Sequence, residues 1–270
     1  MEYRKLGNLD VSVIGLGTLR AFDVTEDADL APRRHIIDNL LIEDINFIDS
    51  AAMYGAAEKA VGLTIEGRRE SFHLATKVRV NGREAGENQI SESFANFNTD
   101  YIDLFQVHNL IDTETHLVTL EKLKREGKIG MIGITAMVNE AYAEVMDWMR
   151  TGRIDTVQIP YNVVQREVED GVLPLAEELG IGVLVMEPLK KGRFVKDLKK
   201  QPDVTPLKEF GVKTWAQALL SWVISDPRVS ITIPATSRPE RVKENALAGS
   251  LGKMPQELRD YVKDETLRLL

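Results

Sequence analysis

The chain has 270 residues, 43% of them hydrophobic, which is enough for a large buried core. It contains no cysteine, which excludes a disulfide scaffold, a thiolate zinc site and a cysteine nucleophile. The net charge of −8 disfavours nucleic acid and anionic lipid as partners, because both bind a basic face. The first residues are charged, and no apolar stretch is long enough for a membrane span. We therefore expect a soluble, cytoplasmic protein without a metal site.

Short aliphatic runs alternate with longer amphipathic stretches along most of the chain. Before them, EYRKLGNLDVSVIGLGT is typical of a β-hairpin with Gly7-Asn8 at its turn. Eight strands are predicted, at residues 13–18, 45–49, 72–77, 101–108, 129–135, 156–162, 182–187 and 229–235. Helical patterns such as THLVTLEKLKREGK and NEAYAEVMDWMRTG separate them, and a last amphipathic helix starts at Pro255.

This alternation predicts an α/β protein with a parallel sheet. Eight repeats in a chain of this length favour a (β/α)8 TIM barrel over an open doubly wound sheet, which is the alternative. The N-terminal β-hairpin would cover the N-terminal mouth of the barrel, and the last stretch would add an extra C-terminal helix. No linker or low-complexity segment interrupts the pattern, so we predict a single (β/α)8 barrel domain over residues 1–270.

Polar side chains stand at the ends of three consecutive predicted strands. Asp49 ends the second strand and Tyr54 follows it, Lys77 ends the third, and His108 ends the fourth. The active site of a barrel is built at the carboxyl ends of its strands, so these four side chains should converge at one rim.

The chemistry of these residue types suggests proton donation to an oxygen. A tyrosine hydroxyl has a pKa of about 10, and a nearby ammonium such as Lys77 would lower it. Asp49 would keep the buried Lys77 charged, and His108 could donate a hydrogen bond to a carbonyl oxygen. The set lacks a nucleophile activated by a base, so another species must attack the carbon.

DSAAMYG, ATKV and QVHN, in this order, resemble the catalytic tetrad segments of the aldo-keto reductase family. The likeness extends over almost the whole chain, from YRKLG and IGLGT through GKIGMIGIT and QIPYN to IPATSRPERVKEN. The resemblance implies that Tyr54 is the general acid, that Lys77 and Asp49 adjust its pKa, and that His108 orients the carbonyl. It also implies that a reduced nicotinamide supplies hydride.

The segment ATSRPERVKEN, after the eighth strand, has the features of a phosphate site. Barrels often bind phosphate there, at the N-terminus of the following helix, and arginine side chains suit this ligand. By resemblance the segment holds the 2′-phosphate and adenine of NADPH, through Thr236, Ser237, Arg238, Arg241, Glu244 and Asn245. NADPH/NADP+ is therefore expected as cofactor, with NADH weaker. The remaining cofactor contacts that we expect are Thr135, Gln158, Met186, Pro188, Leu189 and Arg193.

Three features depart from the usual family pattern. Met186 stands where many members have an aromatic ring against the nicotinamide, and Ala235 stands where many have a phosphate-binding lysine. The loops that enclose large substrates in some relatives are short here, which suggests an open pocket for varied carbonyls. The seventh loop, LKKGRFVKDLKKQP, is long and basic, and we expect it to close over the cofactor pyrophosphate. Arg79 and Arg83, in the loop after the third strand, could contact a substrate, but solvation at the surface is the favoured interpretation.

Two other functions fit part of the same sequence pattern. The first is a Schiff-base lyase or aldolase that uses Lys77, which its partner Asp49 disfavours. The second is a nicotinamide-binding regulatory module with slow turnover, which the complete tetrad disfavours. The expected partner is a small-molecule aldehyde or ketone, and the chain would be a monomer or a small homo-oligomer.

Overall fold

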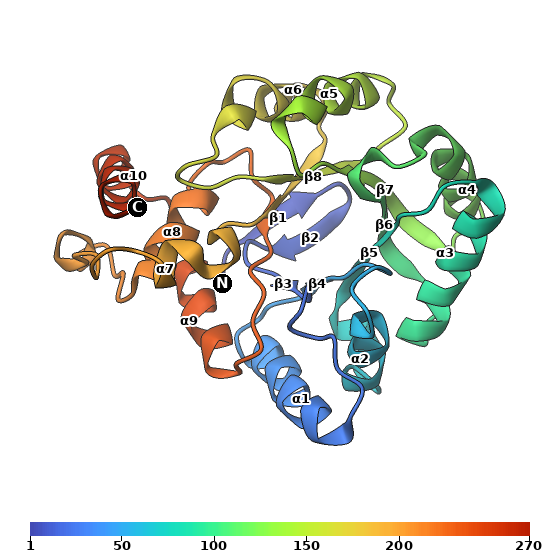
Figure 1. The fold of residues 1–270 in the computed structure, drawn as a ribbon, viewed down its shortest axis with the longest axis horizontal. Coiled ribbons are helices and arrows are strands. Elements are labelled where there is room, and N and C mark those ends of the chain that lie inside the picture. Colours follow the sequence, from blue (N-terminus) through green and yellow to red (C-terminus); the bar gives the residue numbers. More distant parts are fainter.

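The computed structural model describes residues 1–270, and its centre is a parallel sheet of eight strands that closes on itself (Figure 1). Each strand pairs with the next along the chain, from β3 to β10. Parallel bridges from Ile14 to Thr232 and from Gly17 to Ala235 join the first strand to the last. The predicted (β/α)8 barrel is thus confirmed. Its strands are β3 (Leu16–Gly17), β4 (Phe47–Asp49), β5 (His73–Val78), β6 (Ile102–Val107), β7 (Ile129–Thr135), β8 (Thr156–Pro160), β9 (Gly182–Met186) and β10 (Ile231–Thr232).

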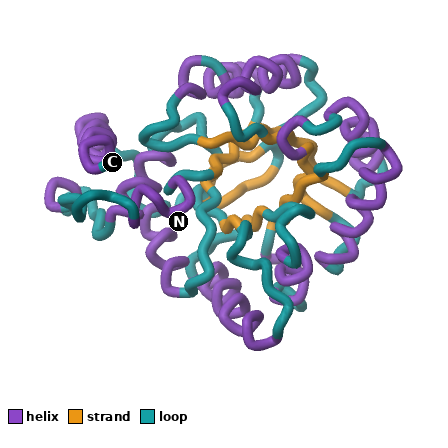
Figure 2. Tube along the Cα trace, viewed as in Figure 1, coloured by secondary structure: helices purple, strands orange, loops and turns teal.

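Helices surround the barrel and separate its strands (Figure 2). The α-helices are α1 (Asp27–Ile42), α2 (Ala57–Thr64), α3 (Arg83–Phe97), α4 (Thr113–Arg125), α5 (Tyr142–Arg150), α6 (Val172–Leu179), α7 (Arg193–Lys196), α8 (Trp215–Ile224), α9 (Glu240–Ala248) and α10 (Gln256–Leu269). Short 3-10 turns are η1 (Arg69–Ser71), η2 (His108–Leu110), η3 (Asn139–Ala141), η4 (Glu167–Asp170), η5 (Lys190–Gly192) and η6 (Thr205–Leu207). None of these helices has both the length and the apolar character that crossing a bilayer requires.

The strands form because both of their faces are covered. Every residue of β6, IDLFQV, is buried, as is usual for a parallel strand between a barrel interior and a layer of helices. The first and last strands are shorter than predicted, with two residues each. Pro234 contributes to this at the last strand, because proline has no N–H to donate to the ladder. Helix α8 is buried along its whole length, so its sequence shows little amphipathic contrast.

An N-terminal hairpin, β1 (Tyr3–Leu6) and β2 (Leu9–Ser12), closes one end of the barrel. In Figure 1 it lies behind the barrel opening. Leu6 and Val11 are fully buried and join the apolar cluster inside the barrel with Phe47, Ala75, Leu104, Met131, Leu184, Ile231 and Ile233. Gly7, at the turn, has φ +56°, and a Cβ there would overlap the Met131 sulfur. The hairpin therefore acts as the plug that the sequence predicted.

We expect Leu6→Ala to lower the free energy of unfolding by about 2–5 kcal/mol, because it opens a cavity where hairpin and barrel meet. Urea denaturation followed by tryptophan fluorescence would measure it. Lys5→Ala, on the exposed face of the same strand, should change the value by less than about 0.5 kcal/mol. A cost below about 1 kcal/mol for Leu6→Ala would contradict the plug.

Candidate active site

The candidate active site is built around an ion pair inside the barrel. Lys77, on β5, places its Nζ 2.7 Å from both carboxylate oxygens of Asp49, the last residue of β4. The same Nζ donates to the Ser50 carbonyl oxygen at 2.6 Å. The two side chains are only 1% and 3% exposed. Burial raises the pKa of Asp49, and the charge of Lys77 opposes that rise. Because both oxygens accept from one ammonium group, we describe the pair as ionised.

Two glutamine amides complete the surroundings of the ion pair. Gln106 and Gln158 direct their Nε2 atoms at Asp49, at 3.4 and 3.5 Å, and Gln106 donates to the Gln158 carbonyl oxygen at 2.9 Å. Gln158 is one of the residues predicted from the sequence at this site, whereas Gln106 is not. The signal was available: Gln106 is a polar residue within an apolar strand, and it pairs in register with Lys77.

Tyr54 lies beside this network, in the loop between β4 and α2. Its ring is 5.4 Å from Lys77 Nζ, and it meets the His108 ring edge-on at 6.0 Å. Burial raises the pKa of the Tyr54 hydroxyl above 10, while Lys77 acts to lower it. Lys77 acts on this pKa in the expected direction, but the desolvation of the half-buried phenol outweighs it, so the pKa is raised. The hydroxyl therefore keeps its proton at neutral pH.

His108 follows β6 and is also buried. Burial, reinforced by the charges of Lys77 and Arg79, lowers its pKa to about 3. The imidazole is consequently neutral at physiological pH and carries one N–H. Its buried Nδ1 has no hydrogen-bond partner within the protein. The structure thus brings together all four predicted tetrad residues at the carboxyl ends of neighbouring strands.

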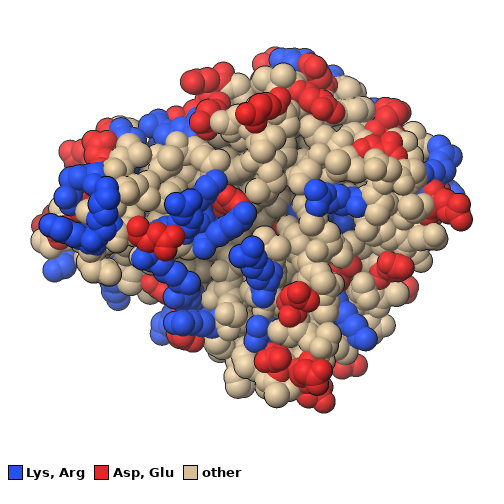
Figure 3. All heavy atoms as spheres, in the orientation of Figure 1, with Lys and Arg blue, Asp and Glu red and all other residues tan.

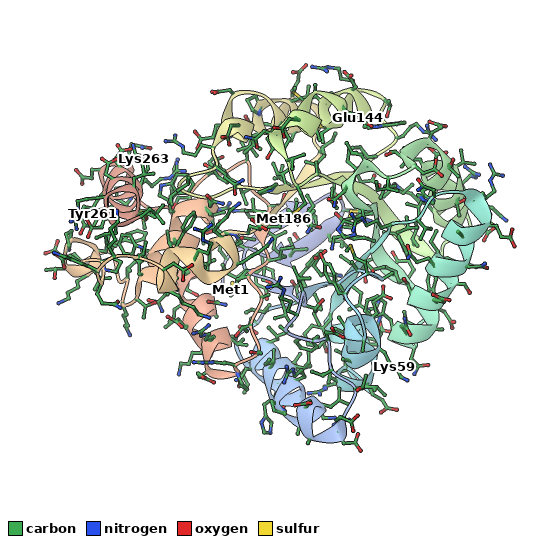
Figure 4. All side chains as sticks on the ribbon, in the orientation of Figure 1. Met1, Lys59, Glu144, Met186, Tyr261 and Lys263 are labelled. Carbon is green, nitrogen blue, oxygen red and sulfur yellow. The ribbon has the colours of Figure 1, made fainter.

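Three of the predicted cofactor contacts adjoin the tetrad. Thr135, at the end of β7, accepts a hydrogen bond from the Asn109 backbone N–H at 2.9 Å. Gln158 belongs to the network around Asp49, and its Nε2 is 3.9 Å from the Met186 sulfur. Figure 4 shows Met186 near the middle of the face formed by the strand ends. These contacts place Gln158 and Met186 beside Asp49, and Thr135 beside Asn109, the residue after His108.

The predicted phosphate segment leads into α9. Thr236 is buried, and its hydroxyl accepts from the Arg238 backbone N–H at 3.1 Å, while Ser237 is exposed. Arg238 is exposed and Arg241 half-buried, and neither forms an ion pair. Both guanidinium groups are thus free for an anion at the start of a helix.

The other predicted contacts are less accessible or already paired. Glu244 accepts a hydrogen bond from the Thr214 hydroxyl at 2.6 Å, which joins α9 to the start of α8, and Asn245 is buried. Pro188 and Leu189 follow β9 in the seventh loop, and Arg193 pairs with Asp197 at 3.5 Å.

The basic residues at the start of the seventh loop are also paired in this structure. Lys190 and Lys191 contact the Glu187 carboxylate at 3.0 and 2.9 Å. Closure of this loop over a pyrophosphate stays a prediction, and it would require these pairs to open or to share their charge.

Comparison with known proteins places this arrangement in a family. A model of the aldo/keto reductase family matches residues 13–264. The chain belongs to the aldo-keto reductase family. Methylglyoxal reductase YeaE of Escherichia coli (strain K12) is 31% identical over 252 residues, which cover 89% of this chain and 86% of that protein.

Solved structures of aldo-keto reductases share the fold. An aldo/keto reductase from Klebsiella pneumoniae in complex with NADP and acetate superposes with a TM-score of 0.82 at 26% identity, covering 96% of this chain and 93% of that one. An aldo-keto reductase from the same organism in complex with NADPH gives 0.82 at 26% identity, covering 98% and 95%. The family is one of oxidoreductases, so the chain is classed as an enzyme of this type.

The low pKa of His108 predicts a dependence of stability on pH. Between pH 6.5 and about 3 the unfolded chain binds a proton at this residue and the folded chain does not. The free energy of unfolding therefore falls as the pH is lowered through this window, by up to about 1.4 kcal/mol per pH unit from this group.

We expect His108→Gln to lose this part of the acid sensitivity. Urea denaturation at pH 7, 6, 5 and 4 would compare it with the wild type and with His35→Gln, which replaces an exposed histidine of α1. The His108→Gln curve should fall less steeply than the other two. Parallel curves for all three proteins would contradict the assignment.

Proposed function

We propose that this enzyme reduces an aldehyde or ketone with NADPH, and that Tyr54 protonates the carbonyl oxygen. The observation that carries the proposal is the convergence of a protonated Tyr54, a neutral His108 and the buried Lys77–Asp49 pair at one rim of the barrel. The comparisons support the oxidoreductase class. The Tyr54 mechanism is our own proposal.

The residues present suit a nicotinamide cofactor. Arg238 and Arg241 have no carboxylate partner and stand at the start of α9, as a phosphate group would require. Thr135 and Gln158 offer a hydroxyl and an amide beside the tetrad, which suits a carboxamide. Two related structures, bound to NADP and to NADPH, support the same choice, and NADH would bind more weakly. When bound, NADPH supplies the hydride for the carbonyl carbon.

The protein's own part is to bind, orient and protonate the substrate. The neutral His108 donates its N–H to the carbonyl oxygen and so fixes the oxygen near the Tyr54 hydroxyl. Tyr54 then transfers its proton to that oxygen as negative charge develops there. Lys77, held charged by Asp49, stabilises the tyrosinate that remains. Each of these groups is therefore already in the protonation state that reduction requires.

The same geometry argues against the lyase or aldolase alternative. A Schiff-base lysine must lose its proton to become a nucleophile. Lys77 donates to Asp49 and to the Ser50 carbonyl oxygen at 2.6–2.7 Å, so it is paired, charged and occupied. The regulatory alternative, a nicotinamide-binding module with slow turnover, differs in rate and is separated from the reductase by measuring turnover.

A small carbonyl is the substrate class that we infer. The relative from Escherichia coli is named a methylglyoxal reductase, which makes methylglyoxal a suitable first probe, with 4-nitrobenzaldehyde as an activated aromatic one. We further propose that the enzyme works in the cytoplasm as a single barrel domain, alone or as a small homo-oligomer.

We expect Tyr54→Phe to lower kcat by about 10²–10⁴-fold, because it removes the proton donor. NADPH oxidation with either aldehyde would measure this at 340 nm. NADPH affinity, from titration of tryptophan fluorescence, should be kept. Tyr101→Phe, at the opposite end of the barrel, is the matched control and should keep full turnover. Equal turnover in wild type and Tyr54→Phe would refute the mechanism, and wild type that binds NADPH without consuming it would favour the regulatory module.

We expect Arg241→Ala to weaken NADPH binding by about 10–100-fold, because a hydrogen bond to a charged group contributes about 1.5–3 kcal/mol. NADH, which lacks the 2′-phosphate, should be affected much less. Lys243→Ala, on the exposed face of the same helix, controls for a general loss of positive charge. The measurement is the dissociation constant of each cofactor for each variant. An equal loss of affinity for NADPH and NADH in Arg241→Ala would rule out Arg241 as the 2′-phosphate ligand.

A further inference from the structure

Arg79 stands at the rim of the barrel, directly after the strand that carries Lys77. Arg79 comes directly after Val78, the last residue of β5, and two positions after Lys77. Its Nη1 lies 3.1 Å from the sulfur of Met53, the neighbour of Tyr54. Its backbone N–H donates to the Gln89 side chain of α3 at 2.6 Å. The main chain is thus anchored, and the guanidinium extends over the tetrad loop.

The Arg79 guanidinium has no anionic partner. No carboxylate lies within 4.0 Å of it, and its only polar side-chain contact is a thioether, a weak acceptor. Some arginines of the protein, such as Arg68, Arg153 and Arg166, pair with carboxylates, whereas Arg79 is among those that do not. An arginine left without a partner beside a reactive centre is available to a ligand.

Arg79 is also the uncompensated charge at the tetrad. Lys77 is neutralised by Asp49, so this pair presents little net charge to a substrate. Burial, Lys77 and Arg79 together lower the pKa of His108, and Arg79 is the only one of these charges that is exposed to solvent. Lysine and arginine side chains gather around the middle of this face, although the whole protein is acidic (Figure 3).

We propose that Arg79 is a specificity residue that binds the carboxylate of an anionic carbonyl substrate. This inference rests on the proposed function. The carbonyl oxygen would lie between Tyr54 and His108, and a carboxylate at the other end of the substrate would accept two parallel N–H bonds from the guanidinium. The preferred substrates would thus be aldehydes or ketones that carry a carboxylate.

The test compares two aromatic aldehydes of similar size, 4-carboxybenzaldehyde and neutral 4-nitrobenzaldehyde, with NADPH. The quantity measured is the kcat/KM for 4-carboxybenzaldehyde divided by the kcat/KM for 4-nitrobenzaldehyde. It is determined for wild type, Arg79→Gln, Arg79→Lys and Arg83→Gln. Arg83, an exposed arginine at the start of α3, is the matched control. We expect Arg79→Gln to lower the ratio by about 10–100-fold, mainly through a higher KM for the carboxylate. The ratio for Arg79→Lys should lie between those of wild type and Arg79→Gln, because lysine keeps the positive charge but cannot donate two parallel N–H bonds to a carboxylate.

The outcomes separate this inference from the function on which it rests. A ratio that stays the same in Arg79→Gln, or that falls equally in Arg83→Gln, would overturn the role of Arg79 while the reductase stands. A wild type that oxidises NADPH with neither aldehyde would overturn the proposed function, and this inference with it. A selective fall in Arg79→Gln, absent from Arg83→Gln, would establish the carboxylate site.

Discussion

The ion pair between Lys77 and Asp49 is the constraint on which the rest of the site depends. Burying two charges costs several kcal/mol each, and their attraction repays this only if every polar atom finds a partner. The Ser50 carbonyl and the amides of Gln106 and Gln158 provide those partners. Removing either charge would leave the other buried without a partner and would destabilise the fold by about 3–5 kcal/mol. The end of the barrel that holds Tyr54 and His108 therefore contains a connected network of polar groups around the ion pair.

The opposite end of the barrel is filled by apolar side chains. Leu6 and Val11 of the hairpin close an apolar layer with Phe47, Met131 and the inward residues of the neighbouring strands. This layer seals the barrel below the ion pair, so the polar layer opens toward the strand ends alone. A low local dielectric follows, and it accounts for both the raised pKa of Tyr54 and the lowered pKa of His108.

Much of this could be predicted from the sequence, because strand order and strand ends are local features. DSAAMYG, ATKV and QVHN placed Asp49, Lys77 and His108 at neighbouring strand ends, and the structure brings them together. The features that escaped prediction depend on distances through space. Whether desolvation or Lys77 dominates the pKa of Tyr54 is decided by its burial, and the pairing of Glu187 with two lysines depends on how the seventh loop folds.

The role proposed for Arg79 also could not be predicted from the sequence. It suggests that substrate selectivity and proton transfer depend on different residues. As a residue in sequence it resembles any solvated arginine, and only its unpaired guanidinium beside Met53 distinguishes it. The charges that serve proton transfer cancel within the buried pair, so they contribute little to the choice of substrate. Arg79, at the rim, is not part of this ion pair, so replacing it leaves the ion pair and its hydrogen bonds intact. Selectivity in this barrel can therefore change at the rim while the Lys77–Asp49 pair keeps its hydrogen bonds.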